Sequence, residues 1–170
     1  ALLHDTGKPA TTAQIAGRWT SHGHAEAGIE PARAFLGSIG APAHIVDRVL
    51  PLIREHMALY NEAKPDEITE RAVRRLADRL HPATIEEWAR LIEADHGGRP
   101  PLPDGLPQQA KRVLEIAQRL RVGSGKPASL LMGRHLRDLM EPGPQMGNLL
   151  RAAYQAQLDG EFDSVNGAVA

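Results

Sequence analysis

Cysteine is absent from this 170-residue chain, and aromatic residues make up only 4% of it. Without cysteine there are no disulfides and no thiolate metal sites, so any metal ion must be held by histidine and carboxylate side chains. Because 42% of the residues are hydrophobic, we expect a core that is largely aliphatic. The formal net charge is only −1, which argues against a globally basic nucleic-acid binder and leaves room for a local basic patch.

Long apolar runs and targeting signals are also missing from the sequence. No stretch approaches the roughly twenty apolar residues that cross a bilayer, and the chain does not begin with a secretory signal. We therefore expect a cytoplasmic protein without a membrane partner. The opening residues ALLHD are typical of the end of a buried helix, so we expect that the earlier turns of this helix precede Ala1.

Strand signals are nearly absent, whereas helical periodicity recurs along the whole chain. We therefore predict an all-α fold, a helical bundle with a small C-terminal helical extension. After a helix that ends with ALLHD, residues 11–23 are predicted to form a loop. Pro31 predicts a kink or a late helix start, and Thr84 is a candidate N-cap. The predicted helices span 24–40, 41–57, 65–80, 84–95, 108–122, 130–140 and 146–160, with one more turn in the tail 161–170.

The segment 96–107 is rich in glycine and proline and is the best internal boundary. It divides the chain into a predicted metal-binding helical domain, 1–98, and a predicted extension, 99–170.

Five ionisable residues are predicted to point from successive helices toward one interior: His4, Asp5, His24, His56 and Asp95. Each one alone is explained better as a hydrogen-bonded core side chain or a helix cap than as a metal ligand. A buried carboxylate, however, is costly unless it is paired or bound to metal, and the sequence suggests no other partner for Asp5. Together the imidazoles and carboxylates suit a divalent ion such as Mn, Ni, Fe, Zn or Mg, and one aspartate can bridge two ions. The remaining histidines are predicted to be surface residues: His22, His44, His81, His96 and His135.

The order His4-Asp5, His24, His56 and Asp95 resembles the HD superfamily of metal-dependent phosphohydrolases, and LLHDTGKP resembles the signature of its second helix. The family pattern has an earlier histidine one helix upstream, which these 170 residues do not contain. The segments LLHDTGKPATT, SHGHAEAG, REHM and LIEADHGGRP narrow the resemblance to the HD region of bacterial tRNA nucleotidyltransferases. The C-terminal GRHLRDLMEPGPQMGNLLRAAYQAQLDGEF is similar to the end of those enzymes. Their nucleotidyl-transfer head is not part of this sequence.

The resemblance implies hydrolysis of phosphoesters, including 2′,3′-cyclic phosphates, 2′-nucleotides and damaged tRNA 3′ ends. Asp5 is then a catalytic residue that bridges metal ions. Lys8 would balance charge on the phosphoryl oxygens, or it is an ordinary solvated turn lysine. The chain departs from one branch of the family, in which aspartate follows the histidine that corresponds to His56. Met57 stands there instead, which puts that branch's phosphatase activity in doubt.

A second candidate surface lies between Asp104 and Asp138, where seven basic residues outnumber three acidic ones. The basic residues are Lys111, Arg112, Arg119, Arg121, Lys126, Arg134 and Arg137. They could form a stripe that faces phosphates, and by resemblance this region holds the body of tRNA. The alternative is a solvated helix face with ion pairs. No aromatic residue interleaves the charges, so base stacking is not expected there.

We therefore expect a metal-dependent phosphohydrolase module with a phosphoester or nucleotide substrate and tRNA as a further partner. The alternative is a non-catalytic module that binds tRNA and keeps the HD frame. An apolar patch at Leu2 and Leu3 would favour self-association, so a homodimer is among the expected states.

Overall fold

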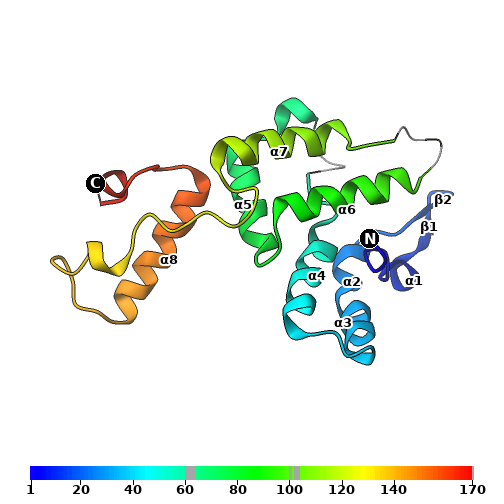
Figure 1. Cartoon of the computed structure of the whole chain (residues 1–170), viewed down its shortest axis with the longest axis horizontal. Coiled ribbons are helices and arrows are strands. Elements are labelled where there is room, and N and C mark those ends of the chain that lie inside the picture. The colour runs from blue at the N-terminus through cyan, green and yellow to red at the C-terminus, as the bar shows by residue number, and fades with distance from the viewer. Residues whose placement is uncertain (60–63, 100, 102–103, 170) are drawn as a thin grey trace.

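The computed structural model describes residues 1–59, 64–99, 101 and 104–169, and nearly all of its regular structure is helical (Figure 1). The predicted all-α fold is thereby confirmed, apart from one small hairpin. No helix in the described part of the chain is long and apolar enough to cross a bilayer. The α-helices are α1 (Lys8–Thr11), α2 (His24–Ala27), α3 (Ile29–Ser38), α4 (Ala43–Glu55), α5 (Glu70–Leu80), α6 (Ile85–Gly97), α7 (Gln108–Leu120), α8 (Pro144–Asp159) and α9 (Val165–Val169), and the 3-10 helices are η1 (Pro65–Glu67) and η2 (Gly133–His135).

The main core lies between α5, α6 and α7, which pack side by side in the centre of the molecule (Figure 1). Leu76, Trp88 and Ile116, one from each helix, are at most 1% exposed. This core joins helices on both sides of the boundary predicted at residue 98, and the division into two domains stays a prediction. Trp88 is the aromatic exception in an otherwise aliphatic core.

Two smaller apolar clusters flank the main core. One joins α3 to α4 through Ile29 and Ile53, and Leu3 packs against it from the N-terminal segment. The other joins α8 to the segment around η2, at the opposite end of the molecule from the N-terminus (Figure 1). Asp159 fastens α8 to α5, because its carboxylate accepts hydrogen bonds from Arg71 at 2.8 Å and Arg75 at 2.6 Å.

Residues 2–7 form consecutive turns, so the prediction that ALLHD closes a helix is wrong. Backbone bonds from His4 to Ala1 and from Thr6 to Leu3 span three residues and are long, at 3.3 Å each. The helix begins after them, with Pro9 in the first turn of α1. Proline favours this position because its missing N–H would have no partner there and its φ already suits a helix.

Residues 11–23 contain a hairpin, not only the predicted loop. Strands β1 (Ala13–Ile15) and β2 (Arg18–Thr20) pair antiparallel. The two residues between them, Ala16 and Gly17, have φ of 48° and 77°, as a tight hairpin turn requires. The pair Ala-Gly carries a weaker turn signal than Asn-Gly, and strands of three residues are too short to show an alternating pattern.

Two further local predictions are confirmed and one is wrong. Helix α3 starts late, with Pro31 in its first turn, and the Thr84 side chain caps α6 by accepting a hydrogen bond from the Glu87 amide. The helix predicted over 130–140 is reduced to η2. Leu131 and Leu136 both pack in the cluster against α8, and residues five apart do not share one face of an α-helix.

The ion pair between Arg48 on α4 and Glu87 on α6, with N and O 2.5 Å apart, gives a pH-dependent test of the fold. Burial by itself would raise the pKa of Glu87, but Arg48 and the Thr84 cap hold it below its usual value of 4.5. A lowered folded-state pKa means that the stabilisation by ionised Glu87 is complete above pH 4.5 and is lost as the pH falls further.

Arg48→Met should therefore lower the free energy of unfolding by up to about 1 kcal/mol near pH 7. The difference from the unsubstituted protein should shrink by about pH 3.5. Urea denaturation at both pH values measures it, and an equal difference at both would contradict the assignment.

Candidate metal centre

The five residues predicted as metal ligands come together in one cluster. His4 Nε2 lies 3.0 Å from Asp95 Oδ1 and 3.3 Å from Asp5 Oδ2. His24 Nε2 lies 3.4 Å from Asp5 Oδ1 and 3.0 Å from His56 Nε2. The cluster therefore joins the N-terminal turns, the start of α2, the end of α4 and the last turns of α6.

Asp5 is the common member of two possible metal-binding groups. One group consists of Asp5, His24 and His56, and the other consists of Asp5, His4 and Asp95. Within each group the ligand atoms lie within 4.8 Å of one another. The two oxygens of the Asp5 carboxylate face different groups, which is the arrangement that a bridging carboxylate needs.

All three histidines of the cluster are held by the same local contact. In each, Nδ1 lies 2.5 to 2.7 Å from the backbone carbonyl oxygen of the residue three positions earlier. A carbonyl only accepts hydrogen bonds, so Nδ1 must donate its proton and Nε2 keeps a lone pair when the ring is neutral. The pairs are His4 with Ala1, His24 with Ser21, and His56 with Ile53.

This orientation of the rings fits a divalent cation. With both rings neutral, the lone pairs of His24 and His56 face each other at 3.0 Å, and that of His4 faces the carboxylate of Asp95. Such opposed acceptors repel unless a proton or a metal ion lies among them. A carbonyl bound to Nδ1 is also the usual way in which proteins orient a metal-ligating histidine, and nitrogen and carboxylate oxygen together suit Mn, Fe, Ni or Zn.

The protonation states favour the same conclusion. Burial lowers the pKa of His56 to about 4, with His24 and His4 adding to the effect, so the ring is neutral near pH 7. Burial alone would raise the pKa of Asp5, but the hydrogen bond from Lys8 and the charge of His4 hold it below its usual value. Neutral imidazole and ionised carboxylate are the forms that bind metal.

Close packing of the backbone brings the N-terminal turns to α2. A Cβ atom built on Gly7 would lie 2.1 Å from the His24 carbonyl oxygen and 2.5 Å from the Gly28 nitrogen. Only glycine allows this approach, which sets Asp5 beside His24.

The position of His56 depends on the buried Glu55 before it. The carbonyl of Glu55 accepts a hydrogen bond of 2.8 Å from the Trp88 indole, and its carboxylate pairs with Arg79 at 3.0 Å. Helices α5 and α6 therefore both hold the end of α4, where His56 lies 2% exposed.

Two cationic partners were missed in the sequence. Lys8 Nζ lies 2.5 Å from Asp5 Oδ2, so Asp5 has a partner besides any metal ion. Arg99, one helical turn after Asp95, donates to its carboxylate. Spacings of three and four residues are the signals that could have identified both pairs. The surface histidines are placed outside the cluster: His22, His44 and His81 are exposed, and His96 and His135 are half-buried.

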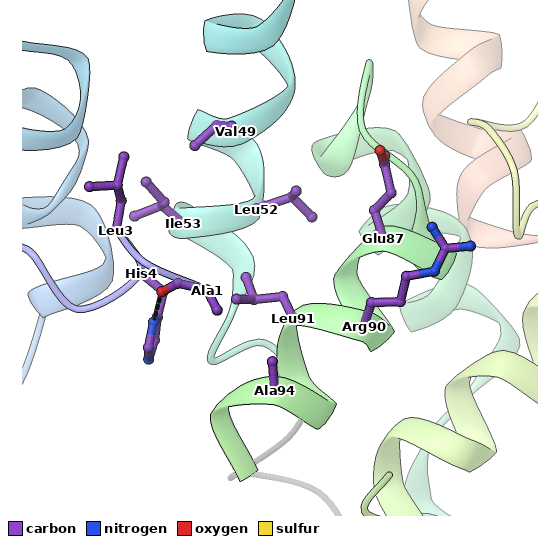
Figure 2. A pocket seen from close by; sticks show the side chains of 10 residues that line it. All are labelled: Ala1, Leu3, His4, Val49, Leu52, Ile53, Glu87, Arg90, Leu91 and Ala94. Atoms are coloured by element: carbon purple, nitrogen blue, oxygen red, sulfur yellow. Dashed lines mark hydrogen bonds between the residues drawn. The ribbon is translucent and has the colours of Figure 1, made fainter. Parts of the chain in front are cut away.

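Two cavities adjoin the cluster. The first, of about 280 Å³, is mostly aliphatic, and in Figure 2 Leu91 lies between His4 and the distant Arg90. The second, of about 520 Å³, lies between the hairpin and α2 and contains Lys8 and His24. The second cavity therefore offers the polar side of the cluster to a ligand.

The predicted basic residues do not form one continuous stripe. Arg112 pairs with Glu115 at 3.1 Å and Arg119 pairs with Glu70 at 2.8 Å. The segment around η2 lies on the other side of α8 from α7 (Figure 1). Lys111, Arg112, Arg119 and Arg121 lie on α7 or at its end, Lys126 lies in the following loop with Nζ 6.0 Å from the Tyr154 ring centre, and Arg134 and Arg137 lie in or just after η2.

Comparison with known proteins finds matches to the N-terminal half of the chain and to nearly its whole length. Residues 1–83 match the family model described as the HD domain. This range contains His4, Asp5, His24 and His56, whereas Asp95 lies beyond it. No solved structure matches the chain significantly.

Three curated proteins are similar to most of the chain. A CC-adding tRNA nucleotidyltransferase of Thermus thermophilus is 32% identical over 94% of this chain and 35% of its own length. An A-adding tRNA nucleotidyltransferase of Deinococcus radiodurans is 30% identical over 94% of this chain and 37% of its own length. A multifunctional CCA protein of Laribacter hongkongensis is 31% identical over 72% of this chain and 31% of its own length. The chain spans about a third of the length of these relatives.

The sharing of Asp5 between two ligand groups predicts unequal effects of two isosteric substitutions. Asp5→Asn should weaken metal binding by more than the about 10- to 100-fold that loss of an outer-shell partner costs, because both groups lose a ligand. Asp95→Asn should remove only the ion held with His4. Elemental analysis and isothermal titration measure metal content and affinity, and circular dichroism checks that the helices persist.

The matched control is Asp47→Asn, which changes an exposed aspartate of α4 outside the cluster. Its metal content should equal that of the unsubstituted protein. Full metal content in the Asp5→Asn protein would show that Asp5 is not a ligand.

Proposed function

Residues 1–83 belong to the HD domain family, and from this premise we propose that the chain is the metal-dependent phosphohydrolase module of a protein related to tRNA nucleotidyltransferases. Its substrates are phosphoesters, among them 2′,3′-cyclic nucleotides and phosphorylated RNA 3′ ends. The observation that carries the proposal is the opposed set of acceptors formed by three imidazoles and two carboxylates.

Different residues would bind the ion and the phosphate. Asp5 and the three Nδ1-oriented histidines supply fixed ligands, so the chain does not have to reorganise when an ion binds. A bound divalent ion would polarise the phosphoester and acidify a water molecule. The Lys8 ammonium lies beside the cluster and is 46% exposed, so it can place a positive charge against the phosphoryl oxygens.

The nearby cavity supports an anionic substrate. Its ionisable lining residues are Lys8, His22 and His24, and no carboxylate belongs to the described lining. A phosphate that enters this cavity meets the Lys8 ammonium on its way to the cluster. The aliphatic cavity on the other side of His4 offers an approaching phosphate much less, since its one cation, Arg90, is accompanied by Glu87.

The alternative function is a non-catalytic module that binds tRNA. The relatives named as tRNA nucleotidyltransferases favour this candidate, together with the exposed basic residues at the end of α7. The two functions are compatible in one chain, because the basic residues of α7 lie outside the metal cluster. A homodimer stays a prediction; Leu2 is 85% exposed, and light scattering tests the state of association.

Hydrolysis of 2′,3′-cyclic AMP tests the phosphohydrolase directly. We expect turnover in the presence of Mn²⁺, Ni²⁺, Zn²⁺ or Mg²⁺, loss of turnover with a chelator, and loss of at least about 100-fold in kcat/KM for Asp5→Asn, equivalent to about 2.7 kcal/mol. Asp47→Asn should retain the full rate. A protein that binds metal and cyclic nucleotide yet hydrolyses none of the common phosphoesters would refute the enzymatic proposal.

Replacement of Arg119 and Arg121 by glutamine tests the tRNA surface. We expect weaker tRNA binding and a flatter dependence of affinity on salt, because each lost phosphate contact removes about one released counterion. Arg33→Gln with Arg54→Gln removes two arginines from α3 and α4 and serves as the matched control. Equal affinity of both double variants at low and high salt would assign Arg119 and Arg121 to a solvated face.

A further inference from the structure

The cavity beside the metal cluster has an aromatic wall that the proposed function does not use. This cavity, of about 520 Å³, lies within the usual size range of small-molecule sites. Its lining residues are Lys8, Trp19, Thr20, Ser21, His22, Gly23, His24, Ala25 and Met57. His24 belongs both to this lining and to the metal cluster, so a ligand in the cavity reaches the ligands of the ion.

Trp19 is largely exposed, although tryptophan has the largest side chain of all residues and the chain contains few aromatic residues. Its exposed fraction is 74%, whereas the other tryptophan, Trp88, is completely buried. Trp19 lines the cavity that Lys8 and His24 also line. It offers a flat π surface on which any nucleobase can stack.

The hairpin holds Trp19 at the cavity, as two sets of contacts show. Trp19 on β2 pairs with Gln14 on β1, so these two side chains share one face of the hairpin, while Ile15 and Arg18 share the other. At the base of the hairpin, the Thr12 hydroxyl lies 2.8 Å from the Ser21 hydroxyl and donates to the Lys8 carbonyl at 2.7 Å. The hairpin is thus tied to the same turn of chain that carries Lys8.

We propose that Trp19 is the stacking platform for the nucleobase of the substrate, while the phosphate of the same nucleotide lies toward Lys8 and His24. This inference rests on the proposed function and adds a specificity-determining residue to it. Because Lys8 and Trp19 line one cavity, a ligand with an anionic end and a flat aromatic end can contact both side chains. A simple phosphoester without a base can contact only Lys8.

The experiment compares the effect of one substitution on two probes, one with a nucleobase and one without. Adenosine 2′-phosphorothioate, which is hydrolysed slowly, carries the base, and glycerol 2-phosphate lacks it. Trp19→Ala should weaken binding of the adenosine probe by about tenfold or more, the scale of one stacked base, and leave binding of glycerol 2-phosphate unchanged. Trp19→Phe should retain most of the affinity, and Ile15→Ala, on the other face of the hairpin, is the matched control.

Tryptophan fluorescence supplies a readout that does not depend on turnover. In the unsubstituted protein the adenosine probe should quench the exposed Trp19. In Trp19→Phe only the buried Trp88 remains, and the probe should leave its emission unchanged. Quenching that survives in Trp19→Phe would overturn the proposal.

The same substitution shows whether the site binds free nucleotides or RNA ends. If Trp19→Ala weakens binding of the free adenosine probe, the site binds free nucleotides. If it weakens only the binding of a short RNA that ends in a 3′ phosphate, the site binds RNA ends. Equal losses for both small probes, unchanged affinity for all base-containing probes, or a change only in self-association would overturn the Trp19 assignment and leave the phosphohydrolase intact. Failure of the unsubstituted protein to bind either small probe or the RNA would remove both proposals.

Discussion

The convergence of three imidazole nitrogens and two carboxylates at the candidate metal centre is the constraint on which the surrounding structure depends. Three imidazole nitrogens and two carboxylates face one another with Nε2 of His24 and His56 3.0 Å apart. In each histidine, Nδ1 is held by the backbone carbonyl oxygen of the residue three positions earlier, so that Nε2 faces the centre of the cluster. With the rings neutral, this contact opposes the rotation that would separate the facing acceptors. A cation bound among them would relieve their repulsion, and binding to the folded state alone would stabilise that state by mass action.

The rest of the fold supplies the rigidity that such an arrangement needs. Gly7 lets the N-terminal turns touch the backbone of α2, and Glu55 is held by both Arg79 and Trp88 just before His56. Arg48 and Glu87 join α4 to α6 near the start of the helix that carries Asp95. The five clustered residues come from short segments or helix ends, whereas the long helices contribute the contacts that keep those segments in place.

Sequence reasoning identified five residues that the structure brings together, because they stand out chemically, and it failed where local structure depends on tertiary contacts. His56 and Asp95 lie next to apolar residues on their helices, so their burial could be inferred from periodicity. The turns at ALLHD and the hairpin could not be, because the turns lack a recurring pattern and the strands have three residues each. Aromatic residues were sought only among the basic residues of 104–138, whereas the hairpin holds the exposed Trp19 in a cavity that His24 also lines.

Helix α6 connects the five-residue cluster to the C-terminal part of the chain through direct packing. Asp95 lies on α6 beyond the residues that match the HD family model, and α6 shares its buried face with α5 and α7 in one core. Close-packed interiors transmit displacement because they contain few voids that could absorb it. Because α7 packs against α6 in this core, α7 belongs among the elements that position Asp95, the carboxylate beside His4. The five-residue cluster therefore extends beyond the 83 residues of the family match and depends on helices that follow them.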